Sequence, residues 1–173
     1  TGTASTITIR NHVEKLMLKG FVPSVIIIDY ADIMRSTRQY DSLRHELKLI
    51  YEELRNLAMD LNVPIWTASQ ANRESAQSEI VGLENMSEAY GKAMVADVVI
   101  SISRKAMEKA TGHGRLFIAK NRAGQDGLVF PIQIDCSKST FEILDEDVLT
   151  LNEAVNQSES EMKELLRKKW KEV

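Results

Sequence analysis

The stretch VIIIDYADIM, residues 25–34, places four consecutive aliphatic residues directly before Asp29 and Tyr30. An apolar run without polar alternation is typical of a strand that is buried on both faces, as in a parallel sheet, and it favours an α/β fold. Two roles stay open for Asp29 at this point. It is either a turn residue at the end of the strand, or a carboxylate that organises a metal ion and a phosphate.

The neighbouring segments extend this α/β pattern. Residues 4–10, ASTITIR, are typical of a strand, and residues 10–20 predict a helix that ends at Gly20. Aliphatic residues recur at steps of four and three over residues 43–61, which predicts a long amphipathic helix. Residues 64–70, PIWTASQ, predict a second buried strand. Strand, helix and strand in this order predict a right-handed crossover with parallel pairing.

The second half of the chain predicts a different strand arrangement. Residues 71–86 are polar without a clean period and predict a long loop. The following segments predict a short helix at 87–94, a third buried strand at 96–103, an exposed turn region at 105–114, and strands at 115–124, 128–136 and 139–144. Turns containing glycine separate the last three strands, which predicts an antiparallel meander.

The chain is expected to contain three parts. Residues 1–144 form the core domain, residues 145–157 an acidic linker, and residues 158–173 a terminal amphipathic helix. That helix docks either on its own domain or on a partner. The opening Thr1, rather than a methionine, leads us to expect that the chain is a piece of a longer protein.

Composition limits the class of protein. With 43% hydrophobic residues in a chain of 173, a core of ordinary size can form. The single cysteine, Cys136, rules out an intrachain disulfide and favours a reducing cytoplasm, and no apolar run reaches the about 20 residues that a membrane span needs. A net charge of −3 argues against nucleic-acid binding through bulk charge, although residues 104–122 form a basic segment that is either a solvated face or a binding patch.

Polar residues that could bind a ligand or take part in catalysis follow the predicted strands. Ser69 and Gln70 end the second strand, and the amide of Gln70 can donate to a phosphate oxygen or orient a water. Lys120 and Arg122 are two apart on a predicted strand, so we expect them to project to the same side. Two cations together suit a phosphate whose charge grows in a transition state.

Taken in order and spacing, these motifs resemble the motor domain of DnaB-like replicative DNA helicases, particularly the phage versions, within the RecA-like ATPases. The stretch VIIIDYADIM resembles their Walker B strand, and residues 53–73 resemble the following helix and strand with its Ser-Gln and Asn-Arg pairs. AKNRAGQDG, residues 119–127, matches their Lys-x-Arg-x-Gly-x-x-Gly element. The resemblance covers about residues 5–144. It implies a RecA-like three-layer fold with a parallel central sheet and a C-terminal antiparallel meander.

The resemblance also implies roles for single residues. Asp29 would hold Mg²⁺ through water, within an ATP site that includes Tyr30, Ser69 and Gly124. Gln70 would sense the γ-phosphate, and Arg122 would be an arginine finger in the neighbouring subunit's site, with Lys120 beside it. Single-stranded DNA would contact a further set: Asn72, Arg73, Ser87, Glu88, Gly91 and Lys92. The implied assembly is a homo-hexamer in the bacterial or phage-infected cytoplasm, with a primase or a helicase loader as further partners.

One departure limits this resemblance. The sequence contains no Gly-x-x-x-x-Gly-Lys-Ser/Thr, because its only Gly-Lys pair, at Gly91 and Lys92, is followed by Ala93. We therefore expect a helicase domain cut after its P-loop strand and helix, incomplete on its N-terminal side and inactive alone. Enzyme activity of the chain itself stays uncertain. The alternative is a RecA- or RadA-like, or clock-type, binding or regulatory module without helicase activity.

Overall fold

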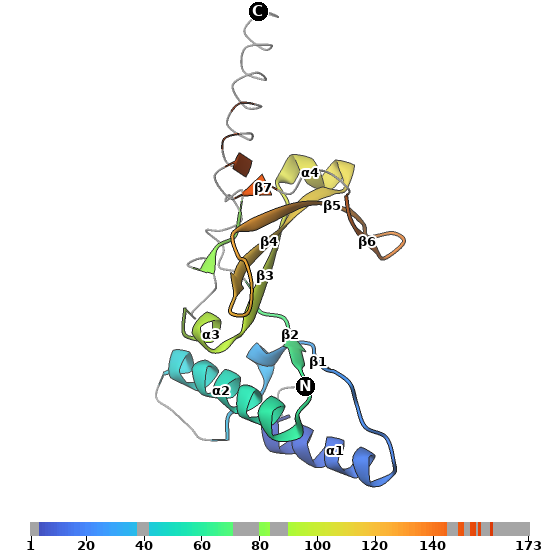
Figure 1. Cartoon of the computed structure of the whole chain (residues 1–173), viewed down its shortest axis with the longest axis vertical. Coiled ribbons are helices and arrows are strands. Elements are labelled where there is room, and N and C mark those ends of the chain that lie inside the picture. Colours follow the sequence, from blue (N-terminus) through green and yellow to red (C-terminus); the bar gives the residue numbers. More distant parts are fainter. Residues whose placement is uncertain are drawn as a thin grey trace, which may run out of the picture. The chain divides into compact units, whose positions relative to one another are not determined.

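A computed structural model of the chain describes residues 4–37, 42–70, 80–83, 90–144, 149–150, 153–154, 156 and 160. The chain divides into two compact units (Figure 1). The first comprises Thr1–Asn72 with Met86–Ala96, and the second comprises Arg73–Asn85 with Asp97–Val173.

The first unit opens with α1, Thr6–Leu18. Ser5 caps this helix, because its hydroxyl accepts from the Thr8 backbone N–H while the Thr8 side chain accepts from the Ser5 backbone N–H. The strand expected at residues 4–10 is therefore wrong. Its alternating threonines and isoleucines favour a strand by propensity, but a capped helix that buries Thr6 and Val13 overrides that weak preference.

Helix α2, Leu43–Leu61, confirms the long amphipathic helix. It ends at Asn62, which adopts a left-handed conformation with a φ of 52°. Helices α1 and α2 lie side by side (Figure 1), joined by a hydrogen bond of 2.7 Å from the Thr6 hydroxyl to Glu53 and by an ion pair between Arg10 and Asp60. The buried stripe of α2 forms the core of the unit: Leu47, Ile50, Tyr51, Leu54 and Leu57.

Strands β1, Ile26–Ile28, and β2, Ile65–Thr67, pair in parallel as predicted. Ile28 and Ile65 pack against the core that α2 contributes. On the opposite face, Ile27 and Trp66 are register partners and are 76% and 55% exposed. The expectation that these strands are buried on both faces is wrong for this chain, because the described helices cover one face of a two-stranded sheet.

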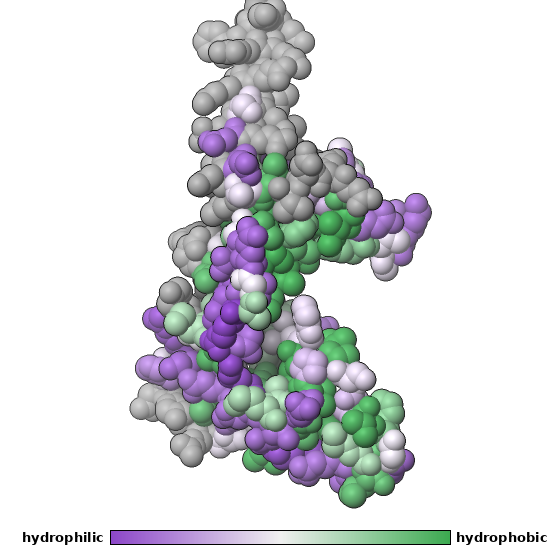
Figure 2. Space-filling model, in the orientation of Figure 1, coloured by the Kyte–Doolittle hydropathy of each residue, from purple (hydrophilic) through white to green (hydrophobic). Residues whose placement is uncertain are grey.

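Two short elements complete the first unit. A 3-10 turn η1, Ala31–Ile33, follows β1, and helix α3, Tyr90–Val95, overlaps the short helix predicted at 87–94 and ends one residue beyond it. Figure 2 shows apolar surface around the end of α1 and its connection to β1, where Leu18, Phe21 and Val22 are exposed. The loop expected at residues 71–86 falls outside the described residues except for 80–83.

The second unit is an antiparallel sheet in the order β3-β4-β5-β6, with β7 also paired to β5. Its strands are β3 Val98–Ser103, β4 His113–Asn121, β5 Leu128–Asp135, β6 Thr140–Ile143 and β7 Leu149–Thr150. The meander of β4, β5 and β6 is confirmed. Phe117, Val129 and Ala154 form its core cluster.

Three expectations in this unit need correction. Strand β3 is not buried on both faces, because Val98, Ile100 and Ile102 alternate as exposed residues along it. The turn region expected at 105–114 contains helix α4, Ala106–Thr111, which ends at Gly112 with a φ of 82°. The segment expected to be a linker contains β7, because Leu149 packs on the sheet core. Of the terminal helix expected at 158–173, only Ser160 is described.

Candidate functional site

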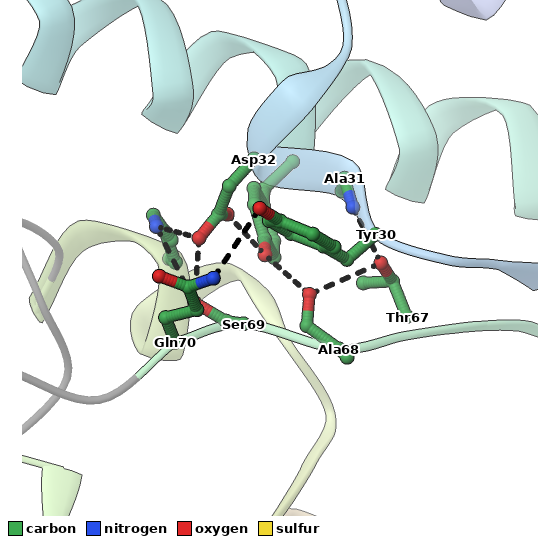
Figure 3. A network of polar contacts seen from close by, with 9 residues as sticks. Tyr30, Ala31, Asp32, Thr67, Ala68, Ser69 and Gln70 are labelled. Atoms are coloured by element: carbon green, nitrogen blue, oxygen red, sulfur yellow. Dashed lines mark hydrogen bonds and ion pairs between the residues drawn. The ribbon is translucent and has the colours of Figure 1, made fainter. Parts of the chain in front are cut away.

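The polar residues that follow β1 and β2 form one cluster, because neighbouring parallel strands end at the same edge of a sheet. Thr67 ties the two ends together. Its hydroxyl donates to the Ile28 carbonyl oxygen at 3.0 Å and accepts from the Ala31 backbone N–H at 2.9 Å. Figure 3 shows the contacts at these strand ends.

Four residues assigned from the sequence meet at this edge. Asp29 and Tyr30 follow β1, joined by a cis peptide bond, and Ser69 and Gln70 follow closely after Thr67, the last residue of β2. The Gln70 side-chain amide donates to the Tyr30 hydroxyl at 3.3 Å, which Figure 3 shows. The structure therefore places Asp29, Tyr30, Ser69 and Gln70 at one strand edge, whereas Gly124, which the resemblance also assigned to the nucleotide site, belongs to the second unit.

Asp29 is exposed, and its carboxylate makes no hydrogen bond or ion pair with another described residue. Its oxygens are thus available to accept hydrogen bonds from waters around a cation, which is how the resemblance uses them. The described residues hold no group of three His, Cys, Asp or Glu side chains that could bind a metal directly.

Asp32 is the centre of a second, more buried set of contacts that sequence reasoning missed. Its Oδ1 accepts from the Tyr51 hydroxyl at 2.8 Å, and its Oδ2 accepts from the Ser69 hydroxyl at 3.0 Å. The ammonium of Lys92 lies 2.8 Å from the same Oδ2 and 3.3 Å from the Ser69 hydroxyl oxygen. Figure 3 shows the side chains of Asp32, Ser69 and Gln70 converging.

Burial makes this ion pair unusual. Lys92 is 1% exposed and Asp32 15%, so neither charge is well solvated, and the ammonium also lies 5.6 Å from the centre of the Tyr51 ring. Burial raises the pKa of the Tyr51 hydroxyl, and the charge and hydrogen bond of Asp32 raise it further. Tyr51 therefore stays a neutral donor to the carboxylate.

The position of Lys92 corrects one sequence-based assignment. A lysine that contacts DNA phosphates needs an exposed ammonium, whereas the Lys92 ammonium is buried and bonded to Asp32 and Ser69. Gly91 is described and packs near the Lys48 side chain. The other residues assigned to DNA lie outside the described residues: Asn72, Arg73, Ser87 and Glu88.

The sequence carried a faint signal for the Asp32–Lys92 pair. Each is an isolated charge within a short apolar segment, YADIM and GKAMV, and such charges are buried only when paired. The two positions are 60 residues apart, so the sequence does not reveal that they are each other's partner.

Lys120 and Arg122, the two cations assigned from the sequence, belong to the second unit. Lys120 lies in β4, but the strand ends at Asn121, so Arg122 is in the following turn and the expectation that both cations share a strand is wrong. The Arg122 guanidinium pairs with Asp97 at 3.0 Å, and both side chains are about half exposed. The Arg122 backbone N–H also donates to the Asp97 carbonyl oxygen at 2.9 Å.

Asn121 shapes the turn that presents Arg122. Its side chain accepts from the Ala123 N–H and donates to the Gln125 carbonyl oxygen. A side chain at Gly124 would begin 2.8 Å from the Asn121 amide nitrogen, and Gly127 has a φ of 75°, so both positions favour glycine. The turn therefore needs the glycine spacing that the sequence motif contains.

Comparison with known families gives one clear match. The family model described as DnaB-like helicase C terminal domain matches residues 1–142 of this chain.

The described residues include no helix that is long and apolar enough to cross a lipid bilayer.

Curated proteins with similar sequences are replicative helicases. A DnaB-like replicative helicase of Enterobacteria phage T4 is 34% identical over 106 residues, which are 59% of this chain and 22% of that protein. A probable replicative DNA helicase of Trieres chinensis is 27% identical over 144 residues, which are 77% of this chain and 31% of that protein. The chain thus spans less than a third of the length of either relative.

Solved structures share the fold. One solved ATPase domain matches with a TM-score of 0.74 at 21% identity, over 83% of this chain and 52% of that chain. A DnaB-like replicative helicase, solved in a study of its interactions with primase, matches with a TM-score of 0.74 at 20% identity, over 84% of this chain and 37% of that chain. The predicted RecA-like α/β fold is confirmed, with a parallel sheet of two strands among the described residues.

Proposed function

Because this chain belongs to the family of DnaB-like helicase C-terminal domains, we propose that it is part of an ATP-dependent replicative DNA helicase. In this proposal, ATP hydrolysis between the subunits of a ring drives movement along single-stranded DNA and unwinding of the duplex. The observation that carries it is the meeting of Asp29, Tyr30, Ser69 and Gln70 at one edge of a parallel sheet. Such edges are where α/β folds bind their ligands.

The cluster of Asp29, Tyr30, Ser69 and Gln70 at the strand ends would bind the nucleotide. Asp29, exposed and without a protein partner among the described residues, would accept hydrogen bonds from the waters of Mg²⁺. The bound cation would neutralise phosphate charge. Gln70 would donate its amide to the γ-phosphate, in exchange for the 3.3 Å hydrogen bond to the Tyr30 hydroxyl.

Arg122 would act across a subunit interface as an arginine finger, with Lys120 beside it on β4. Its ion pair with Asp97 supports this role, because a half-exposed pair stabilises by no more than about 1 kcal/mol and can be exchanged for a phosphate. A finger acting on a neighbour's site requires a ring, which we propose to be a homo-hexamer. The study of a solved relative with primase suggests primase as a partner of the whole protein.

DNA binding would use the segment that follows β2, the residues before α3 and the start of α3 itself. We propose contacts from Asn72, Arg73, Ser87, Glu88 and Gly91, and we do not retain Lys92 in this set because it is buried. Contacts of this kind address backbone phosphates, so binding should weaken as salt concentration rises.

The chain lacks the lysine and glycines of a P-loop, so another segment must supply the phosphate cradle. We therefore propose that the chain alone does not hydrolyse ATP at a meaningful rate. The test compares the purified chain with the complete helicase protein that contains both this chain and a P-loop. Magnesium-dependent hydrolysis by the chain alone would contradict the proposal.

In the complete protein, Arg122→Ala should abolish hydrolysis while leaving nucleotide binding nearly unchanged, because the finger contacts a neighbour's transition state. Arg10→Ala is the matched control, since Arg10 is also an ion-paired surface arginine. Hydrolysis at the parental rate by the Arg122 variant would show that the finger assignment is wrong. A second candidate, a RecA-like binding module, is favoured by the missing P-loop motif and would show no hydrolysis in any context.

A further inference from the structure

The Asp32 carboxylate holds four elements of the first unit together. It lies in η1, and its three donors come from α2 at Tyr51, from the end of β2 at Ser69, and from α3 at Lys92. A carboxylate with both oxygens bonded and a buried counter-ion has little freedom to change partners. The contact is therefore a rigid junction within the unit.

This junction lies directly beside Gln70. Ser69 donates to Asp32 and accepts from the Lys92 ammonium, and Gln70 is the next residue along the chain. The Gln70 side chain is exposed, and among the described residues its amide donates to the Tyr30 hydroxyl. The direction of Gln70 consequently depends on where Ser69 is held, and Figure 3 shows Ser69 between Gln70 and its contact with Asp32.

We propose that Lys92 and Asp32 are positioning residues for Gln70: their buried ion pair fixes Ser69 and so aims the Gln70 amide at the nucleotide edge. The proposal rests on the proposed role of Gln70 as phosphate sensor. Lys92 itself touches neither nucleotide nor DNA. It acts through Ser69, and it connects α3 mechanically to the end of β2.

A structural role alone can be separated from a positioning role. Replacing both charges with apolar side chains, Asp32→Leu with Lys92→Met, removes the junction without leaving an unpaired buried charge. The Tyr51 hydroxyl keeps the Ala68 carbonyl oxygen, 3.5 Å away, as an acceptor. The unfolding midpoint of this double variant should therefore stay near that of the parent chain.

The measurement is the side-chain amide NMR signal of Gln70 in the isotope-labelled chain, assigned through Gln70→Glu. If the pair positions Gln70, the double variant should shift and broaden this signal while the unfolding midpoint is retained. The matched control removes the partly buried pair of Glu108 and Arg115 in the second unit, joined at 2.6 Å. Glu108→Gln with Arg115→Met should leave the Gln70 signal unmoved.

An unmoved Gln70 signal in a folded double variant would overturn the proposal. If the double variant does not fold, Asp32→Asn decides instead, because it keeps the shape and an acceptor oxygen but removes the charge. A smaller shift of the same signal supports positioning, and an unchanged signal overturns it.

Hydrolysis by the complete protein provides the functional readout. The double variant should lower kcat by about 10-fold to 100-fold, as misplaced groups do, with KM for ATP nearly unchanged. A moved Gln70 signal with parental kcat would show that the ion pair positions Gln70 but that Gln70 is not the sensor. That result would count against the proposed function and leave the positioning itself established.

Discussion

Two ion pairs in this chain each join a cationic side chain to an aspartate, but their surroundings are opposite. Lys92 and Asp32 pair at 2.8 Å in the first unit with exposed fractions of 1% and 15%, whereas Arg122 and Asp97 pair at 3.0 Å in the second unit with 50% and 57%. Their lengths are nearly equal, so length does not distinguish them. Burial distinguishes them. Removing one partner leaves the other charge buried and unsolvated in the first pair, but hydrated in the second.

The comparison suggests two different uses of a charge. The two charges of the buried pair stay together because water cannot replace either partner. This suits a fixed junction. The half-exposed pair can exchange Asp97 for water or for a phosphate at small cost, and this suits a group that must reach a ligand. Four predictions test this difference, ordered by the size of the expected effect.

The largest effect is expected for the buried pair. Lys92→Met should lower the free energy of unfolding of the first unit by about 3–5 kcal/mol, because it leaves the Asp32 carboxylate buried without its cation. Urea unfolding followed by Trp66 fluorescence measures this, with Trp170→Phe as the background so that Trp66 is the reporter. Lys48→Met is the control, since Lys48 is 51% exposed in its pair with Glu52. Equal losses for the two lysine variants would refute the distinction by burial.

The next effect concerns the neutral donor to the buried carboxylate. Tyr51→Phe should cost about 1–3 kcal/mol at neutral pH, because it removes a 2.8 Å hydrogen bond to Asp32. Burial raises the pKa of Tyr51 above its ordinary value of 10.0. The folded state therefore keeps the proton after the unfolded chain has lost it.

The pH dependence follows from that raised pKa. The contribution of Tyr51 to stability is complete below about pH 10 and is lost as pH rises above it. The difference in unfolding free energy between the parent chain and Tyr51→Phe should thus be constant from neutral pH to about pH 9 and shrink at about pH 11. A difference that stays constant over the alkaline range would show that Tyr51 titrates normally in the folded chain.

The sequence predicted the features that arise from local periodicity. The spacing of Leu47, Ile50 and Leu54 predicts α2, the order of strand, helix and strand predicts the parallel β1–β2 pairing, and the glycine-containing turns predict the meander. Asp29, Ser69 and Gln70 were placed at one sheet edge because the carboxyl ends of parallel strands coincide, and Tyr30 was added by the family resemblance. The confirmed features therefore depend on patterns within one element or between adjacent elements.

The features that the sequence did not predict depend on packing between distant segments. The cap at Ser5 decided α1 against the strand propensity of residues 6–9. The exposure of Ile27 depends on which segment covers the outer face of β1. The apolar run alone does not predict that segment. Lys92 was assigned to DNA because the family resemblance placed it there, and only the three-dimensional contact with Asp32 shows that it is buried.

A smaller effect is expected for the half-exposed pair. Arg122→Ala should change the unfolding free energy of the second unit by less than about 1 kcal/mol, since its charge is hydrated and Asp97 stays solvated without it. Chemical denaturation of the chain, followed by backbone amide NMR signals of β4, measures this unit separately. A loss as large as that of Lys92→Met would mean that Arg122 is a structural residue, and it would weaken the case for an arginine finger.

The smallest effect lies at an exposed turn, where the carboxylate is bonded but not buried. The Ser137 hydroxyl donates to Asp135 at 2.6 Å and the Ser137 backbone N–H donates at 2.9 Å, and these bonds lower the pKa of Asp135. A lowered pKa contributes stability that is present above the unfolded value of 3.8 and is lost as pH falls through the folded value.

Ser137→Ala should raise the pKa of Asp135 toward 3.8 without restoring it fully, because the backbone donor remains. Carboxyl NMR titration measures the change. Glu153, whose pKa is lowered by its own bonds to Thr150, is the internal control and should keep its value. At this site the hydrogen bond stabilises a charge that water already solvates, so the variant should lower the unfolding midpoint at neutral pH only slightly. A substantial drop in that midpoint would show that a hydrogen bond to a solvated carboxylate can also stabilise the fold strongly, so burial alone would not explain the difference expected between the two ion pairs.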